Sequence, residues 1–285
     1  MSIRIEYERA LTTVQMQVGT KCYVRRWQTL AGAVAGLGTG AAAGLLGVGG
    51  GEFRIPVLLR VLNLPVQSAS AANLIIGLCT VTLSASRRVG HLTWTREDAI
   101  LVAWMAAASL VGSAFGVIWR AHVSHRPLLR IVRGYLILVG LWMLYESVSH
   151  NEHVLFDPEG APRVVLSALV AGLIAVASAM IGVAGGEMRI PALMYLFAVP
   201  ITTAGTLSLL ASIPTVGAGA ITDWRLGQLR REVWIAVALL AVPSILGVLV
   251  GAYFVPLIDR RILTGIFGAV LLASSVRLTA HHRRD

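Results

Sequence analysis

Charged side chains and cysteines are both scarce in this sequence of 285 residues. Only 13% of the residues are charged, whereas 56% are hydrophobic, and the mean hydropathy is +0.75. This composition excludes an ordinary soluble domain, in which about a quarter of the residues carry a charge. The two cysteines, Cys22 and Cys79, show no metal-ligand spacing and are interpreted as small apolar residues.

Recognisable catalytic and nucleotide-binding motifs are missing as well. No Ser-His-Asp order or carboxylate pair suggests hydrolysis, and the glycine-rich segments lack the Gly-Lys-Ser/Thr of a phosphate-binding loop. The seven histidines fall in expected loops and in the C-terminal tail without evident acidic or thiolate partners, so no metal site is expected. We therefore expect a protein that is not an enzyme and that holds no cofactor.

The net charge of +10 fits a membrane protein better than a nucleic-acid-binding one. No basic run is interleaved with aromatic residues, so nucleic-acid binding is not expected. In a membrane protein, an excess of Lys and Arg reflects their accumulation in cytoplasmic loops. The arginine pairs at the ends of apolar segments are interpreted as interfacial anchors; they are Arg87, Arg88, Arg230 and Arg231.

Long apolar segments are what the sequence has in abundance. Eight of them are roughly 20 residues long, enough to cross the hydrocarbon core of a bilayer. They cover 28–47, 66–86, 98–119, 128–148, 163–183, 200–221, 232–254 and 261–280. We therefore expect an all-α, polytopic protein of the cell's inner (plasma) membrane, surrounded by lipid, whose first apolar segment is an uncleaved anchor.

One phrase occurs twice in the chain. Residues 47–56 read Gly-Val-Gly-Gly-Gly-Glu-Phe-Arg-Ile-Pro, and residues 182–191 read Gly-Val-Ala-Gly-Gly-Glu-Met-Arg-Ile-Pro. The same offset of 135 residues relates one polar helical face to another: Ser70, Asn73, Gly77, Thr80 and Ser84 to Gly205, Ser208, Ser212, Thr215 and Gly219. An internal repeat built around glycine, Glu and Arg indicates a membrane transporter assembled from two related halves.

The repeat and the acidic linker divide the chain into five parts. They are a cytoplasmic N-terminal tail at 1–27, a first membrane repeat at 28–148, the linker at 149–162, a second membrane repeat at 163–280 and a basic tail at 281–285. Glycines spaced by four are interpreted as helix-packing positions; they are Gly36, Gly40 and Gly44, Gly112 and Gly116, and Gly247 and Gly251.

A short apolar piece follows each copy of the phrase. Residues 53–62 and 188–198 are about ten residues each, roughly 15 Å as helix, so neither can cross a membrane alone. Either the preceding segment crosses fully and the short piece dips back, or the two form a re-entrant hairpin. The distribution of Lys and Arg favours the hairpin, which gives each half an odd number of crossings and makes the repeats inverted.

The glycines of the phrase predict a break in each helix. A glycine costs up to about 1 kcal/mol relative to Ala in a helix, so a helix is expected to end there and a short one to begin. The free N–H groups and positive dipole end of that short helix suit an anion. The backbone positions expected to bind it are Gly49, Gly50, Gly51, Gly185 and Gly186. The alternative is that these glycines only permit close helix crossing.

Four charged residues accompany these glycines in apolar surroundings: Glu52, Arg54, Glu187 and Arg189. They are interpreted either as neutral Glu–Arg pairs or as a site in which the arginines bind an oxyanion and the glutamates balance charge or carry protons. From the polar faces, Asn73, Thr80, Ser208, Ser212 and Thr215 are expected to line the path of the substrate. Small hydroxyls also hold helices together, and this alternative remains open.

The doubled phrase, its prolines Pro56 and Pro191, and the helices that follow resemble the sulfite exporter TauE/SafE family of membrane transporters. The resemblance covers about 28–280 and implies an inner-membrane carrier, often an exporter, of sulfur oxyanions such as sulfite, sulfoacetate or thiosulfate. Many members of that family have apolar residues where this chain has its Glu and Arg residues, which leaves the carried ion open.

Three functions are consistent with the sequence. The first is a secondary carrier, working as an exporter, of small sulfur-containing oxyanions such as sulfite or organosulfonates. The second is a cation carrier or channel in which Glu52 and Glu187 are ligands, and the third is a membrane scaffold without transport. A homo-oligomer is left open, as are the direction of transport and the coupling ion.

Overall fold

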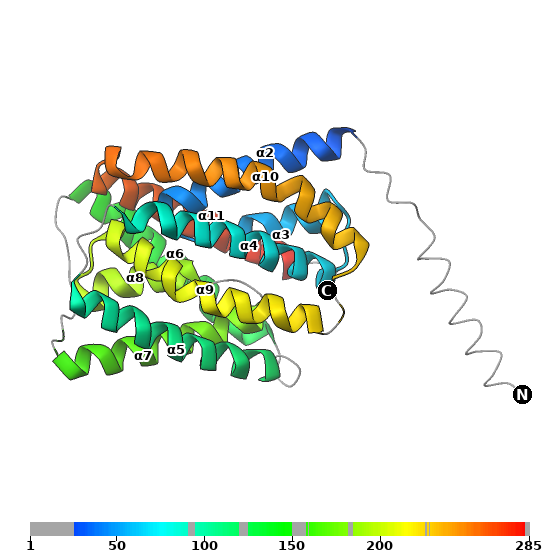
Figure 1. Cartoon of the computed structure of the whole chain (residues 1–285). Helices are drawn as coiled ribbons and strands as arrows, with labels where there is room; N and C mark the ends of the chain where they lie inside the picture. The colour runs from blue at the N-terminus through cyan, green and yellow to red at the C-terminus, as the bar shows by residue number, and fades with distance from the viewer. Residues whose placement is uncertain are drawn as a thin grey trace, which may run out of the picture.

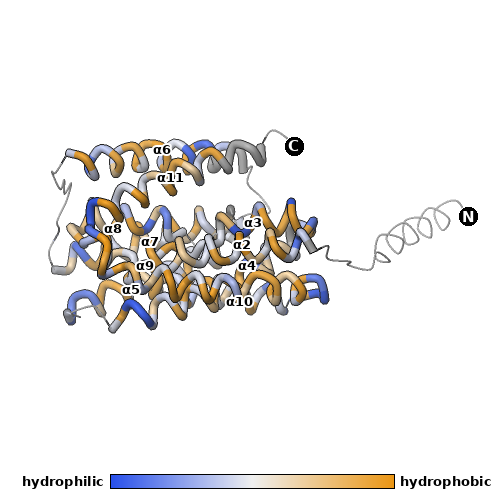
Figure 2. Tube along the Cα trace, turned by 90° about the horizontal axis from the view of Figure 1, so that it is seen from above, coloured by the Kyte–Doolittle hydropathy of each residue, from blue (hydrophilic) through white to orange (hydrophobic). Residues whose placement is uncertain are grey.

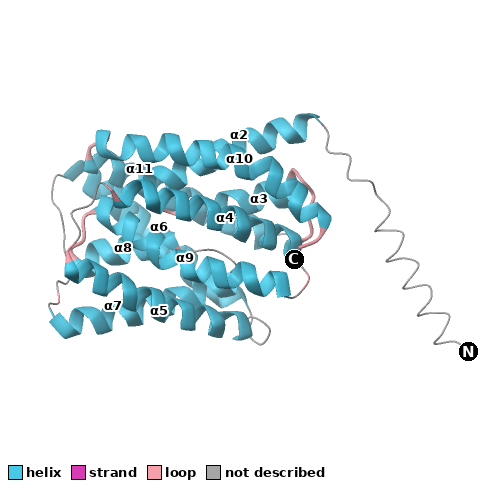
Figure 3. Cartoon of the chain, in the orientation of Figure 1, coloured by secondary structure: helices cyan, strands magenta, loops and turns pink. Residues whose placement is uncertain are grey.

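The computed structural model describes residues 26–90, 95–119, 125–149, 158, 160–181, 185–225, 227 and 229–282. Within this part the chain is helical and contains no strand (Figure 1, Figure 3). Nearly all of the expected N-terminal tail and more than half of the acidic linker lie outside the described residues, as do the last three residues of the C-terminal tail.

Each expected apolar segment is a long helix. The first repeat contains α2 (Arg26–Leu46), α4 (Val66–Val89), α5 (Arg96–Trp119) and α6 (His125–Ser149). The second contains α7 (Gly160–Ile181), α9 (Ile201–Arg225), α10 (Arg231–Phe254) and α11 (Arg260–His282), with the 3-10 turn η1 (Val255–Leu257) before α11. Two short helices complete the described set, α3 (Gly51–Arg60) and α8 (Gly186–Phe197).

The surface of this bundle is suited to lipid. By length and composition, seven of the long helices, all except α11, can cross a membrane. Large apolar side chains are exposed along them, including Trp104, Leu138, Leu173 and Val250. Figure 2 shows strongly hydrophilic residues mostly near the two ends of the bundle. Exposed apolar surface over the length of the helices is what a bilayer requires, and the chain is a polytopic membrane protein.

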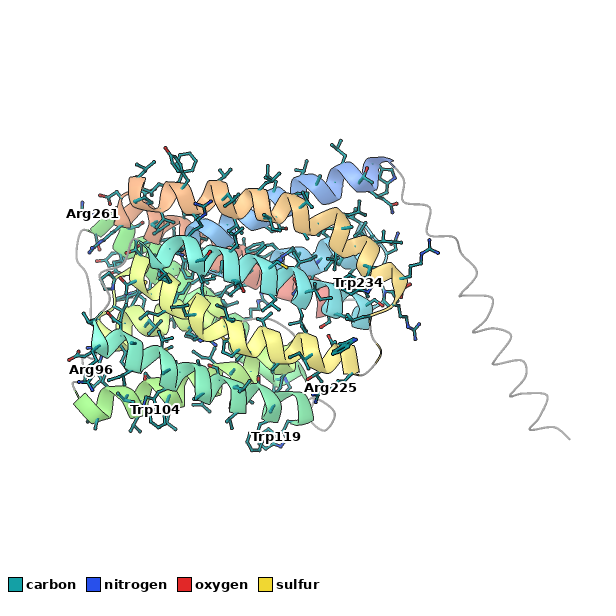
Figure 4. All side chains as sticks on the ribbon, viewed as in Figure 1. Arg96, Trp104, Trp119, Arg225, Trp234 and Arg261 are labelled. Carbon is teal, nitrogen blue, oxygen red and sulfur yellow. The ribbon has the colours of Figure 1, made fainter. Side chains whose placement is uncertain are left out.

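The helices of the two repeats correspond at the offset of 135 residues but run in opposite directions. Both α5 and α10 begin at equivalent positions, Arg96 and Arg231. In Figure 4, α5 runs from the end of the bundle near Arg96 to the end near Trp119, whereas α10 runs from Trp234 toward the end where Arg261 lies. Equivalent helices are therefore antiparallel, in agreement with an inverted repeat.

Two hydrogen bonds identify α2–α3 and α7–α8 as re-entrant hairpins. The Gln28 side chain, at the start of α2, donates to the carbonyl oxygen of Val61 at 2.7 Å, just after α3 ends. Arg163, at the start of α7, donates to the carbonyl oxygen of Phe197 at 3.1 Å, at the end of α8. Each short helix thus returns to the side from which its long partner started, as the Lys and Arg distribution predicted.

The two repeats are interlocked because each contributes one helix to the other. Helix α10 packs mainly against α2 and α4, and α5 packs mainly against α7 and α9, whereas α6 and α11 pair with each other. The glycines expected at packing positions form these contacts. A Cβ on Gly40 would overlap the backbone of Ser244, and one on Gly112 would overlap the carbonyl oxygen of Gly172. Close backbone approach of this kind stabilises helix pairs in lipid.

Candidate anion site

Two broken helices begin inside the bundle. Gly50 and Gly185 precede α3 and α8 with φ of 66° and 72°, and Gly47 has φ of 79°, a left-handed conformation that glycine adopts without strain. A Cβ on Gly50 would lie 2.8 Å from the carbonyl oxygen of Thr39, so α3 starts beside the middle part of α2. The helices begin at Gly51 and Gly186, two residues before the short segments 53–62 and 188–198 that the sequence indicated.

Arg54 folds back onto the start of its own helix. It is fully buried, and its Nε donates to the carbonyl oxygen of Gly50 at 3.2 Å. Its Nη2 donates to the carbonyl oxygen of Gly49 and to the hydroxyl of Thr80, the latter at 3.2 Å. The guanidinium therefore lies at the positive end of the α3 dipole, where a cation is unfavourable unless an anion is close.

Arg189, the equivalent residue of the second repeat, has different partners. Its exposed fraction is 1%, and its Nη1 donates to the hydroxyl of Ser212 at 2.7 Å and to the carbonyl oxygen of Ser208 at 3.2 Å. Its Nη2 donates to the hydroxyl of Ser109 on α5 at 3.3 Å. A helix contributed by the first repeat thus completes the surroundings of the arginine in the second.

A polar side chain also faces the start of each short helix. A Cβ on Gly51 would lie 2.7 Å from Nδ2 of Asn73, and one on Gly186 would lie 3.5 Å from the hydroxyl oxygen of Ser208. Asn73 and Ser208 are equivalent residues, and both are buried. Among the described residues, neither Oδ1 of Asn73 nor Oγ of Ser208 has a hydrogen-bond partner.

The two helix starts lie close together. A Cβ on Gly186 would be 3.3 Å from Cα of Val48 and 3.7 Å from the carbonyl oxygen of Gly47. The segment between α2 and α3 therefore passes against the first residue of α8. The structure brings both copies of the phrase into one region of the bundle.

In the part of the chain that the structure describes, the hydrogen bonds of the two arginines do not lead to Glu187. Glu187 is buried and accepts a hydrogen bond from the hydroxyl of Ser274 on α11, at 3.1 Å. The partners of Arg54 and Arg189 are carbonyl oxygens and hydroxyls. The side chain of Glu52 lies outside the described side chains.

Only part of the polar face that we expected to line a path lies at the arginines. The hydroxyl of Thr215 donates to the carbonyl oxygen of Ser212, within its own helix, and does not bond to either arginine. A Cβ on Gly219 would be 3.2 Å from the Leu74 side chain, and one on Gly77 would be 3.7 Å from Val216. These glycines provide the contact between α4 and α9, which is a packing role.

The sequence interpretation missed three residues of this region. Ser109 and Ser274 lie in largely apolar helices, although the repeat offset relates Ser109 to another serine, Ser244. Arg88 was interpreted as an interfacial anchor like Arg87, yet it is only 3% exposed. The sequence carries no signal that separates the two neighbouring arginines, because both follow the same apolar segment.

Comparison with known proteins now identifies the family. A sequence model described as "Sulfite exporter TauE/SafE" matches residues 32–278, which is most of the chain. The chain belongs to the TauE/SafE family. It is also similar to the probable membrane transporter protein YunE of Bacillus subtilis (strain 168), with 28% identity over 129 residues, 44% of this chain and 45% of that protein. The chain thus aligns with less than half the length of this curated relative, and no solved structure matches it.

Membership of the TauE/SafE family confirms the resemblance noted in the sequence and the assignment as a membrane transporter. The matched region contains both glycine phrases and both arginines. Among the described residues of this TauE/SafE chain, no group of three or more His, Cys, Asp or Glu side chains could hold a metal ion. The buried polar side chains around the two helix starts include the arginines, Asn73, Glu187 and several hydroxyls.

Proposed function

We propose that this TauE/SafE protein is a secondary carrier of small sulfur-containing oxyanions, such as sulfite or organosulfonates, in the inner membrane of the cell. One observation carries the proposal. Arg54 and Arg189 are buried at the starts of two broken helices, and their hydrogen bonds in the described part of the chain include no carboxylate. The positive ends of two helices and two guanidinium groups thus converge in one region.

The energetic cost of this arrangement favours a bound anion. A charged side chain at the centre of a bilayer costs at least ~2.5–3.5 kcal/mol, and this cost applies to both Arg54 and Arg189. Each also retains an N–H group without a partner among the described residues, Nη1 of Arg54 and Nε of Arg189. Hydrogen bonds to charged groups are worth about 1.5–3 kcal/mol each, so an oxyanion that accepts from both offsets much of the cost.

Oxyanions suit these donors better than a spherical anion does. A guanidinium presents N–H groups in a planar fork, and tetrahedral or pyramidal sulfur oxyanions have several oxygens that can accept from more than one of them. The amide of Asn73 adds a neutral donor beside the start of α3, whereas the hydroxyls of Thr80 and Ser212 accept from the arginines and hold them in place. The description of the family as sulfite exporters supports the same substrate class.

The inverted repeat provides a mechanism for alternating access. Carriers of this type bind the substrate where two broken helices meet and then rock one group of helices against the other. Here the unit formed by α2, α3, α4 and α10 can move against the unit formed by α5, α7, α8 and α9. We propose that net transport is outward, so that the protein works as an exporter.

Flux measurements on the purified protein in proteoliposomes test this function. Sulfite, thiosulfate, sulfoacetate, sulfate and chloride are compared with divalent cations. We expect flux of a sulfur oxyanion that falls about a hundredfold or more in the Arg54→Ala/Arg189→Ala variant, because several charge-assisted hydrogen bonds are lost. The matched control is Arg87→Ala, an exposed arginine on α4. Efflux and influx rates in sided vesicles test the proposed outward direction.

The cation alternative makes the opposite prediction in the same assay. Cation flux that persists in the double arginine variant, but is lost in Glu52→Gln/Glu187→Gln, would overturn the anion carrier. It would assign the carboxylates, rather than the guanidinium groups, to the substrate.

A further inference from the structure

A third buried arginine lies near the site and has unused donors. Arg88 is in the last turn of α4, and its Nη2 donates to the carbonyl oxygen of Thr202 at 3.0 Å. Its Nε and Nη1 are buried and have no hydrogen-bond partner among the described residues. A guanidinium has five N–H donors, and leaving some of them buried without acceptors is costly. The position therefore favours an acceptor that the described part of the protein does not provide.

The Arg88 guanidinium packs directly on glycine backbone. A Cβ on Gly47 would lie 2.5 Å from Nη1, and one on Gly205 would lie 2.9 Å from both Nη1 and Nη2. Gly47 is the first residue of the first glycine phrase, and Arg54 bonds to the other end of the same segment at Gly49 and Gly50. Three residues span at most roughly 10 Å, so one short glycine segment joins the surroundings of the two arginines.

The second repeat has no counterpart of Arg88. The offset of 135 residues places Asp223 at the equivalent position, in the last turns of α9, where it is half-buried. The repeat is inverted, so equivalent positions lie toward opposite faces of the membrane. Figure 4 shows this for the helix ends, with Arg225 after Asp223 at one end of the bundle and Arg96, which follows α4, at the other. A buried cation lies toward one face and a carboxylate toward the other.

We propose that Arg88 forms a second anion-binding station that is accessible from one face of the membrane only. The inference rests on the proposed function, because the ligand is the same sulfur-containing oxyanion. The oxyanion accepts hydrogen bonds from Nε and Nη1 of Arg88 and then passes along the segment from Gly47 to Gly50 toward Arg54. Asp223 provides no such attraction at the opposite face. The carrier is therefore asymmetric in its affinity for substrate.

Initial rates in inside-out and right-side-out vesicles of an expression host test the station. In the wild type, the half-saturation concentration of the transported oxyanion should be lower from the face at which α4 ends. Arg88→Gln should raise this half-saturation concentration about tenfold from that face, as expected for lost charge-assisted hydrogen bonds. The half-saturation concentration measured from the other face should change by no more than about twofold. Arg88→Lys should retain much of the affinity, and Arg87→Gln is the matched control from the same helix turn.

Three results would overturn the station. The first is equal half-saturation at both faces of the wild type, which requires no variant to fold. The second is an equal loss of apparent affinity for the oxyanion at both faces in Arg88→Gln, together with a lowered melting temperature, which is the pattern of a purely structural arginine. The third is a one-sided effect that appears with anionic lipid and vanishes in liposomes of neutral lipid, which would assign Arg88 to a lipid headgroup. A wild type that carries no oxyanion from either face would instead refute the proposed function itself.

Discussion

Replacing Ser109 and Ser244 by Ala, one at a time, should change stability in opposite directions. The two serines occupy equivalent positions on α5 and α10, and both are 0% exposed. Ser109 accepts a hydrogen bond from Nη2 of Arg189 at 3.3 Å and donates to the carbonyl oxygen of Ala171 at 3.4 Å. The hydroxyl of Ser244 has no hydrogen-bond partner among the described residues. The pair therefore isolates the contribution of the contact with the arginine.

The expected magnitudes follow from these distances. A hydrogen bond to a charged group contributes about 1.5–3 kcal/mol, and the two bonds of Ser109 are long, so we expect Ser109→Ala to destabilise by about 1.5 kcal/mol. A buried hydroxyl without a partner costs about 1–3 kcal/mol, so removing that of Ser244 should stabilise the protein by up to about 1 kcal/mol. The small cavity left by either substitution adds a similar cost, which increases the destabilisation by Ser109→Ala and reduces the stabilisation by Ser244→Ala.

Thermal unfolding of the purified protein in detergent, followed by tryptophan fluorescence, measures the difference. With roughly 2–4 °C per kcal/mol, the scaling for slightly shorter chains, Ser109→Ala should lower the melting temperature by about 3–6 °C. Ser244→Ala should leave it unchanged or raise it by a few degrees. Equal decreases in the two variants would refute the reasoning, because the contact with Arg189 would then contribute nothing beyond side-chain volume.

Two further predictions concern the packing and the hairpins. A Cβ at Gly251 would overlap the carbonyl oxygen of Ala41, so Gly251→Ala should destabilise by about 1–3 kcal/mol. In the same unfolding assay, Gly38→Ala should have little effect, since no atom lies within 4 Å of its added Cβ. Arg163→Gln removes the hydrogen bond to the carbonyl oxygen of Phe197, so amide hydrogen exchange at the end of α8 should become faster. Unchanged exchange there would show that this bond does not hold the hairpin.

Much of the fold could be predicted from the sequence, because the bilayer imposes a simple rule on it. A segment that crosses lipid needs about 20 apolar residues, and the eight such segments are the eight long helices. The repeated phrase located both short helices, and their length alone excluded a full crossing. Local chemistry also placed the breaks correctly, since Gly50 and Gly185 adopt left-handed conformations.

The arrangement of the helices and the details of the site were less accessible. An apolar residue that faces lipid has the same hydropathy as one that faces another helix, so the exchange of α5 and α10 between the repeats leaves no periodic signal. For the same reason, the sequence does not show that Arg88, at the end of an apolar segment, faces other helices and is buried. The repeat relation makes Thr215 the counterpart of Thr80, which accepts a hydrogen bond from Arg54. Arg189 nevertheless donates to Ser212, because equivalent side chains need not make equivalent contacts.

The exchange of helices between the repeats has a consequence for the order in which the protein is made. The glycines of α2 pack on α10, whose residues follow about two hundred positions later in the chain. While the ribosome synthesises the segments in between, the face of α2 that will contact α10 must be covered by lipid or by other helices. Neither half can close its bundle alone, so a chain truncated after α6 should be recognised as incomplete by membrane quality control. The candidate anion site, which takes residues from both repeats, is complete only once synthesis has nearly finished.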